Sequence, residues 1–326
     1  MRTRRLGDSD LNVSAVGIGT WVLGGDHWGN IKENESISAI HKAIDSGINL
    51  IDTAPAYGIG RAEEIVGKAI KGRREKVVIS TKCGVHRSGK SFSFVLKPDE
   101  IRKELEDSLR RLNVDVIDLY QCHWPDPDTP MEDTMGEMLR IQKEGKIRYI
   151  GVSNFGTELL EKARALAPLV STQPQYSLLD RKIEQDVLPY CRNHNMGVLA
   201  YGSLGSGILT GKYTSPPKFD SGDARSFFYP FYKEPTFSKV MELVGEMKKI
   251  ADSHGKLLAH VAINWVAQQV GITSALVGIR TVDQAITNAD TMSWELTLDD
   301  FYGIESAYKR IFGETLSASA DGFGAN

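Results

Sequence analysis

The sequence predicts an α/β fold, a closed (β/α)₈ TIM barrel, formed by a single domain of residues 1–326. Short apolar segments alternate along the chain with amphipathic helical patterns, and this alternation is typical of parallel βα units. Eight such units fit a closed barrel better than an open doubly wound sheet. The length of 326 residues is one that such barrels reach as one domain.

The expected strands are apolar segments of four to six residues, and each is followed by a helical pattern. Pro98 and Gly145 support two helix ends, since proline favours the first helical position and glycine the position after the last turn. Two further helices, at 237–254 and 299–312, exceed the eightfold count. The strands are expected at 15–19, 48–52, 77–81, 116–121, 147–152, 170–173, 198–201 and 275–278. The helices are expected at 33–46, 61–70, 98–112, 131–144, 157–166, 183–194, 257–270 and 281–290.

Three segments stand apart from this alternation. Residues 1–14 predict an N-terminal β-hairpin around the turn at 7–10. Residues 202–233 form a long irregular stretch, and loops of this length in compact domains are usually functional or mobile. Residues 315–326 are rich in Gly, Ala and Ser and predict a flexible tail.

Composition bounds the kinds of partner that the protein can have. Hydrophobic residues make up 41% and charged residues 25%, with a formal net charge of −3, so no basic footprint for nucleic acid or for a membrane surface is expected. No stretch approaches the length of a membrane span. Cys83, Cys122 and Cys191 are few and widely spaced, which predicts neither disulfides nor a metal site. We expect a cytoplasmic protein that is a monomer.

Four polar side chains lie at or just beyond three neighbouring strand ends, where barrels place their active sites. Asp52 ends the second strand and Tyr57 follows it; Lys82 and His123 come at the ends of the third and fourth. Each alone has an ordinary structural explanation, as a turn, a packed aromatic, a solvated terminus or a loop histidine. Together they predict a proton-transfer site that suits the reduction of a carbonyl group.

The expected roles follow from ordinary pKa values. A tyrosine titrates near ~10, so Tyr57 needs a nearby cation to stabilise its phenolate, and Lys82 can supply one. Asp52 would keep that lysine charged, and a neutral His123 would hydrogen-bond the substrate oxygen or act as a second acid. Because side chains alternate along a strand, Cys83 and Cys122 should face the helix layer.

The sequence resembles the aldo-keto reductases, and the resemblance covers nearly the whole chain. It is most similar to bacterial members of the general-stress and inositol-operon branch, in the run at 123–127 and in residues 202–213. The matching pieces are Gly17-Ile18-Gly19-Thr20-Trp21, Asp52-Thr53-Ala54-Pro55-Ala56-Tyr57-Gly58, Thr81-Lys82, His123-Trp124, Gly151-Val152-Ser153-Asn154-Phe155 and Tyr201-Gly202-Ser203-Leu204-Gly205-Ser206-Gly207.

The resemblance implies an NADP-dependent oxidoreductase with Tyr57 as general acid, supported by Asp52, Lys82 and His123. It also implies contacts along the whole cofactor. Ser153, Asn154 and Gln173 would bind the nicotinamide carboxamide, and Tyr201 would stack on the ring. The pyrophosphate would lie on Ser203, Leu204, Gly205 and Ser206. The implied cofactor set also includes Gly19, Thr20, Trp21, Asp52, Gly202, Gly207 and Lys212.

The adenosine end of the cofactor is expected on Gly278, Arg280, Thr281, Gln284 and Asn288. Arg280 suits a 2′-phosphate by its charge, which favours NADP(H) over NAD(H). The motif departs from the common family pattern, because Gln284 stands where arginine is frequent and Thr287 where glutamate usually precedes Asn288.

The substrate pocket is expected to be lined by aromatic residues, which favours aldehydes or ketones of modest polarity. Its predicted members are Trp21, Trp28, Tyr57, His123 and Trp124; the run Phe227-Phe228-Tyr229 suits a pocket wall and ordinary packing equally. Gly58-x-Gly60 resembles a dinucleotide fingerprint, but Glu63 replaces its third glycine. We interpret these two glycines as a source of loop flexibility beside Tyr57.

Two other functions compete with carbonyl reduction. One is an NADP(H)-binding subunit that senses redox state for a partner with little turnover. The other is a Schiff-base aldolase that uses Lys82, which the nicotinamide-type residues disfavour.

Overall fold

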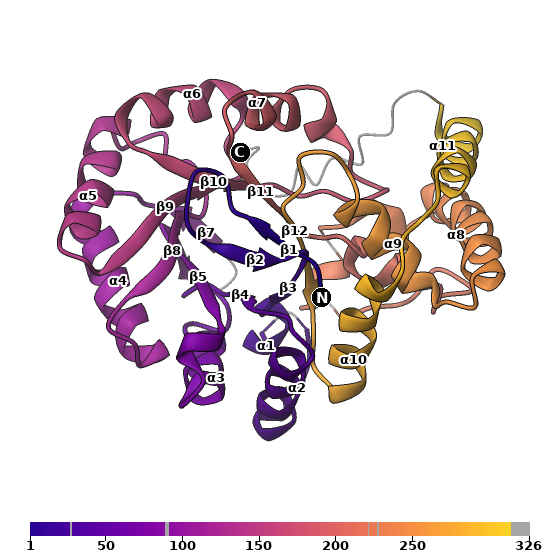
Figure 1. The fold of residues 1–326 in the computed structure, drawn as a ribbon, viewed down its shortest axis with the longest axis horizontal. Coiled ribbons are helices and arrows are strands. Elements are labelled where there is room, and N and C mark those ends of the chain that lie inside the picture. The colour runs from indigo at the N-terminus through magenta and orange to yellow at the C-terminus, as the bar shows by residue number, and fades with distance from the viewer. Residues whose placement is uncertain (27, 89–90, 221, 227, 314–326) are drawn as a thin grey trace.

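The computed structural model describes residues 1–26, 28–88, 91–220, 222–226 and 228–313. It confirms the (β/α)₈ barrel: eight parallel strands close in the order β10-β11-β12-β3-β4-β5-β8-β9. Figure 1 shows the helices arranged around these strands. The strands are β3 (Val16–Gly19), β4 (Leu50–Asp52), β5 (Val78–Cys83), β8 (Ile117–Cys122), β9 (Ile147–Ser153), β10 (Leu169–Gln173), β11 (Gly197–Ala200) and β12 (Ser274–Gly278).

The helices that cover the barrel agree with the amphipathic patterns. Pro98 occupies the start of α4 and Gly145 follows α5 with φ +78°, as predicted. The extra helices α8 (Thr236–Ser253) and α11 (Leu298–Phe312) pack against each other outside the ring (Figure 1). The others are α2 (Glu33–Asp45), α3 (Arg61–Ile70), α4 (Pro98–Leu112), α5 (Met131–Lys143), α6 (Thr157–Leu166), α7 (Val187–Asn193), α9 (Leu258–Ala267) and α10 (Val282–Asp290).

The predicted N-terminal hairpin closes the amino-terminal end of the barrel. Its strands, β1 (Thr3–Arg5) and β2 (Asn12–Ser14), pair antiparallel, and Figure 1 shows them lying across the strands. The connecting segment supplies buried apolar side chains that fill the end of the barrel. This cluster contains Leu6, Leu11, Val13, Leu50, Leu119, Val170, Leu199 and Leu276.

Two short elements were not predicted. Helix α1 (Trp21–Gly24) follows β3, and a second hairpin of β6 (Val85–Ser88) and β7 (Ser91–Phe94) follows β5. Both come directly after barrel strands, so they stand at the carboxyl-terminal mouth. The described part of the long segment at 202–233 is irregular as expected, with short 3₁₀ turns at Gly205–Thr210, Ala224–Ser226 and Pro230–Tyr232.

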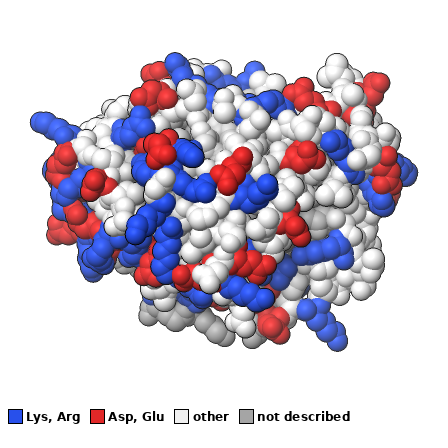
Figure 2. Space-filling view, turned by 60° about the horizontal axis from the view of Figure 1, so that its bottom comes forward, with Lys and Arg blue, Asp and Glu red and all other residues white. Residues whose placement is uncertain are grey.

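Two further expectations concern the surface and the chain end. Figure 2 shows Lys and Arg interspersed with Asp and Glu on the face that it draws. Across the described ranges, no helix is long and apolar enough to cross a membrane. The predicted tail at 315–326 lies outside the described residues.

Candidate active site

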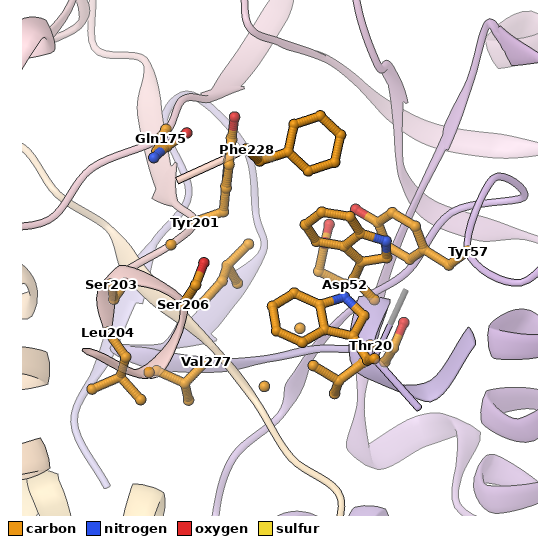
Figure 3. Close-up of a pocket in the computed structure, with 18 of the residues that line it drawn as sticks. Thr20, Asp52, Tyr57, Gln175, Tyr201, Ser203, Leu204, Ser206, Phe228 and Val277 are labelled. Atoms are coloured by element: carbon orange, nitrogen blue, oxygen red, sulfur yellow. The ribbon is translucent and has the colours of Figure 1, made fainter. Parts of the chain in front are cut away.

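A pocket of about 400 Å³ opens at the carboxyl ends of the strands and is lined by most of the predicted site residues. Figure 3 shows Thr20, Asp52 and Tyr57 on one side of it and Ser203, Leu204 and Ser206 on the other. Lys82, Gly205, Thr281 and Asn288 do not line it. Those that do are Gly19, Thr20, Trp21, Trp28, Asp52, Tyr57, His123, Trp124, Ser153, Asn154, Gln173, Tyr201, Gly202, Ser203, Leu204, Ser206, Gly207, Lys212, Gly278, Arg280 and Gln284.

The predicted proton-transfer residues are in mutual contact. Lys82 is fully buried, and its Nζ donates to both carboxylate oxygens of Asp52, at 2.9 and 2.7 Å, and to the carbonyl of Thr53 at 2.9 Å. The same Nζ lies 3.3 Å from Tyr57 Oη. Parallel pairing of β4 and β5 brings Asp52 beside Lys82, since Asp52 is in register with Ser80.

The electrostatics of the lysine agree with the prediction, whereas those of the tyrosine do not. Burial lowers the pKa of Lys82, and the charge and hydrogen bonds of Asp52 oppose that shift. We expected the charge of Lys82 to stabilise the Tyr57 phenolate, which would lower the pKa of Tyr57. Instead burial, and then the negative charge of Asp52, raise the pKa of Tyr57 well above its ordinary value. The phenol therefore stays protonated at neutral pH, as a proton donor must.

His123 completes this wall of the pocket. Its ring meets the ring of Tyr57 edge to face, with centroids 5.8 Å apart. Burial and the charge of Lys82 hold the pKa of His123 well below its ordinary value. The imidazole is thus neutral at physiological pH, which agrees with the expected hydrogen-bonding role.

The residues expected at a carboxamide form one hydrogen-bonded group. Ser153 Oγ donates to the Gln173 carbonyl at 2.7 Å, and Gln173 Nε2 donates to Asp52 Oδ1 at 2.7 Å. Asn154 adopts a left-handed conformation with φ +61° and donates to the His123 carbonyl, while Tyr201 Oη donates to Asn154 Oδ1 at 3.0 Å. This part of the pocket therefore has amide and hydroxyl groups beside the contact between Tyr57 and Lys82.

The glycine-rich tract after β11 turns tightly along the wall of the pocket. Gly202, Gly205, Ser206 and Gly207 all have positive φ values, of +76°, +53°, +55° and +95°. The N–H groups of Gly205 and Gly207 donate within the tract, to the carbonyls of Gly202 and Leu204 at 2.8 and 2.9 Å. Lys212 lines the same part of the pocket.

Several residues predicted to bind the adenosine end of the cofactor hydrogen-bond to one another in the structure. Asn288 is buried and its amide donates to the Gly278 carbonyl at 3.3 Å. Thr281 caps α10 by accepting from Gln284 N–H, and Gln284 Oε1 accepts from Arg280 N–H at 2.7 Å. The Arg280 guanidinium lines the pocket and donates to the Trp28 carbonyl.

The substrate side of the pocket is aromatic. Trp21 contacts Trp28 edge to face with centroids 5.3 Å apart, and it also meets Tyr57 and Phe228. Phe228 and Tyr229 are buried against the core and also line the pocket, so both of the interpretations considered for them hold. Phe227 lies outside the described residues.

Several lining residues were not found from the sequence. Val85 and Phe92 come from the unpredicted hairpin, and Gln175 and Arg225 come from loops. Arg225 pairs with Asp223 and lies over the Trp28 ring, 5.4 Å from its centroid. For Gln175 a signal was available, because it follows Gln173 at the spacing that keeps a side chain on the same face.

The two strand-end cysteines behave as core residues, as predicted. Cys83 and Cys122 pair in register between β5 and β8 and are buried in the layer under the helices. Burial raises the pKa of the Cys83 thiol well above its ordinary value, which disfavours a nucleophilic role. Among the described residues, no group of three or more His, Cys, Asp or Glu could hold a metal ion.

Comparisons with known proteins identify a family. A model described as the aldo/keto reductase family matches residues 15–309. The aldo-keto reductase YhdN of Bacillus subtilis is 42% identical over 303 residues, 92% of this chain and 91% of that one. The NADH-specific methylglyoxal reductase of Escherichia coli is 34% identical over 91% of this chain and 95% of its own. The structure of the glycerol dehydrogenase AKR11B4 from Gluconobacter oxydans superposes with a TM-score of 0.89 at 40% identity, over 99% of both chains.

Proposed function

The chain belongs to the aldo/keto reductase family of oxidoreductases, and on this premise we propose that it reduces aldehydes or ketones to alcohols with NADPH, reversibly. The observation that carries the proposal is the contact of Tyr57 Oη with Lys82 Nζ at 3.3 Å on the wall of the pocket. It supports the proposal because a protonated phenol on this wall could give its proton to a carbonyl oxygen in the pocket.

The chemistry of the pocket fits a nicotinamide dinucleotide. Thr20 Oγ1 and Trp28 Nε1 are buried on its wall and, within the described part of the chain, have no hydrogen-bond partner. Lys212, Arg225 and Arg280 bring positive charge to the same pocket, which suits a ligand with several phosphates. When bound, the cofactor supplies the hydride that reaches the carbonyl carbon.

The residues of the chain would then handle the proton and the substrate orientation. Tyr57 gives its proton to the carbonyl oxygen, and the adjacent Lys82 ammonium stabilises the phenolate that forms. His123, which is neutral, hydrogen-bonds the same oxygen and orients it. The aromatic wall around Trp21 excludes water and selects substrates of modest polarity.

Preference for NADPH over NADH is part of the proposal and depends on Arg280. Arg280 lines the pocket at the expected adenosine end, with Arg225 near it, and a bidentate donor suits a phosphate. Replacement by methionine keeps much of the side-chain volume and removes the charge. We expect Arg280→Met to lower kcat/KM for NADPH by about ten-fold or more with NADH little affected. Equal losses with both cofactors would contradict a 2′-phosphate role.

A panel of aldehydes and ketones, followed by NADPH absorbance, tests the activity itself. Tyr57→Phe should lower kcat by about 10²-fold or more, because it removes the proton donor while keeping the ring. NADPH binding, measured by fluorescence, should be retained. The matched control is Tyr120→Phe, since Tyr120 is a buried tyrosine that donates to the Ile101 carbonyl away from the pocket. Full turnover by Tyr57→Phe would refute the mechanism.

The structure bears on the aldolase alternative, and an experiment separates the other. Lys82 has no exposed surface and does not line the pocket, which disfavours an attack on a substrate carbonyl by its amine. Tight NADPH binding without turnover across the panel would favour the redox-sensing subunit.

A further inference from the structure

Glu63 is a carboxylate with no exposed surface in helix α3, outside the barrel wall. Its Oε1 accepts a hydrogen bond from Thr81 Oγ1 at 2.6 Å, and its Oε2 accepts one from Arg111 Nε at 2.7 Å. A buried carboxylate is expensive to desolvate, and a well-packed apolar residue at such a site is often as stable. Stability alone therefore gives no reason for its presence.

The position of its partners suggests a reason. Thr81 directly precedes Lys82 on β5, so the two side chains point to opposite faces of the strand. On the other side, Ala62, which directly precedes Glu63, donates its N–H to the Tyr57 carbonyl at 3.2 Å. Glu63 is thus joined to both members of the contact between Tyr57 and Lys82.

These connections form a closed ring through the barrel wall. It runs from Tyr57 Oη to Lys82 Nζ, along the peptide to Thr81, across to Glu63, along the peptide to Ala62, and back to the Tyr57 carbonyl. We propose that Glu63 is a positioning residue that sets, from outside the barrel, the separation of Tyr57 Oη from Lys82 Nζ. The inference deepens the proposed function and rests on it for the role of Tyr57.

The two glycines that precede Glu63 also contribute to this arrangement. Gly58 and Gly60 have φ +65° and +89°, and a Cβ on Gly58 would lie 2.4 Å from the Gly24 carbonyl oxygen. A Cβ on Gly60 would lie 2.6 Å from Arg111 Cδ. Besides the loop flexibility that we predicted, these glycines permit close packing, and Gly60 leaves room for the arginine that holds Glu63.

The charge of Glu63 also affects Lys82, because it favours the protonated form of the lysine. Lys82 is faced by Asp52 from β4, Tyr57 from the following loop and His123 from the end of β8, and the charge of Glu63 acts on it from the other side of β5. Burial lowers the pKa of Lys82, and Asp52 and then Glu63 raise it. Glu63 itself is faced by Arg111 and, more distantly, by Glu104 of α4. Removing its charge should lower the pKa of Lys82.

Two variants separate the effect of the hydrogen bond between Thr81 and Glu63 from the effect of the Glu63 charge. Thr81→Val keeps the shape of the side chain and the ion pair of Glu63 with Arg111, but it removes the hydroxyl that joins β5 to α3. Glu63→Gln keeps the shape and removes the charge. Asp118→Asn is the matched control, because Asp118 is a buried carboxylate on the next strand that pairs with Arg74 and Arg148.

The first readout is turnover. Thr81→Val and Glu63→Gln should each lower kcat by about ten-fold, with the KM for NADPH unchanged, because the proton donor is displaced while the cofactor site is intact. Asp118→Asn should lose stability with an unchanged kcat. The proposal is overturned if both test variants behave like this control. If Glu63→Gln does not fold, Thr81→Val decides.

The second readout needs no turnover. Carbon-13 NMR of labelled lysines follows the titration of Lys82, with its signal identified by its loss in Lys82→Met. In Glu63→Gln this titration should move to lower pH; an unchanged titration overturns the inference. If the wild-type protein reduces no carbonyl compound, the proposed function fails, and the lysine titration still decides the role of Glu63.

Discussion

Lys82 carries its charge at a position with no exposure to solvent, and that charge persists because several acceptors surround it. Its Nζ lies within hydrogen-bond distance of four acceptors: the two carboxylate oxygens of Asp52, the Thr53 carbonyl and Tyr57 Oη. An ammonium group has only three donors, so Tyr57 Oη, the most distant of the four, shares a hydrogen with another acceptor. The pair is therefore arranged to stabilise a phenolate only after the tyrosine has lost its proton.

The pH dependence of reduction follows at the same scale. Tyr57 must be protonated and its pKa is raised, so activity should be lost only at alkaline pH, beyond the ordinary tyrosine value of about 10. The pKa of His123 is lowered, so its neutral form should persist on the acidic side. We expect kcat for reduction to be flat between about pH 6 and about pH 9, measured by NADPH absorbance.

His123→Asn provides the control for this profile. An asparagine keeps a neutral hydrogen-bonding group, so kcat should fall while the shape of the profile is retained. An acidic limb near pH ~6.5 that is present in the wild type and absent from His123→Asn would show that the histidine titrates during turnover.

At the scale of elements, a partly buried carboxyl group of α4 holds the backbone at the start of the β6–β7 hairpin. Glu104 Oε2 accepts from the N–H of Gly84, the residue before the hairpin, at 2.5 Å. Val85 and Phe92 of this hairpin line the pocket. Burial is the largest cause that raises the pKa of Glu104, from 4.5 to about 7. The protonated form of this side chain is thus favoured by folding.

The stability of the fold should therefore fall as pH rises through this range. The folded protein keeps the Glu104 proton up to about pH 7, whereas the unfolded chain releases it near 4.5. Between these values the free energy of unfolding should decline by up to about 3 kcal/mol, and urea unfolding measures it. Glu104→Gln should remove the decline. Glu106→Gln, an exposed position on the same helix, should keep it, and equal slopes in both variants would contradict the assignment.

The elements that the sequence predicts are those with a strong hydrophobic period. Most barrel strands are largely apolar and most covering helices are amphipathic, so local pattern and fold agree, although β10 ends in Ser-Thr-Gln and α9 is buried almost all round. The β6–β7 hairpin was not predicted because Val85-His86-Arg87-Ser88 is largely polar. It therefore has no apolar face that would indicate a strand. Helix α1 is one turn long, which is too short for a period to show.

The site likewise contains residues that the sequence predicts and residues that it does not. Asp52, Tyr57, Lys82 and His123 could be predicted because they end consecutive strands, and a barrel brings those ends together. Arg225 could not, because its place over Trp28 depends on the path of an irregular segment. The direction of the Tyr57 pKa was also missed, since it depends on burial and on how fully Asp52 neutralises Lys82.

At the scale of the whole molecule, the barrel separates its function from part of its stability. The pocket opens at the carboxyl ends of the strands, and the N-terminal hairpin fills the opposite end with its own apolar cluster. Leu6 is fully buried in that cluster, and Gly197 leaves it room, because a Cβ there would lie 2.5 Å from Leu6 Cδ1. The two ends of the barrel should therefore respond independently to substitution.

Leu6→Ala tests this separation. Loss of a fully buried leucine side chain should lower the free energy of unfolding by about 2–5 kcal/mol, because the hairpin holds the cavity open and limits its collapse. Leu298→Ala, at a residue that is 74% exposed on α11, should change it by less than about 0.5 kcal/mol. At a temperature where both variants remain folded, kcat and the KM for NADPH should equal the wild-type values. A raised KM in Leu6→Ala would show that the hairpin end is coupled to the pocket through the strands. Substitutions at the two ends of the barrel would then not act independently.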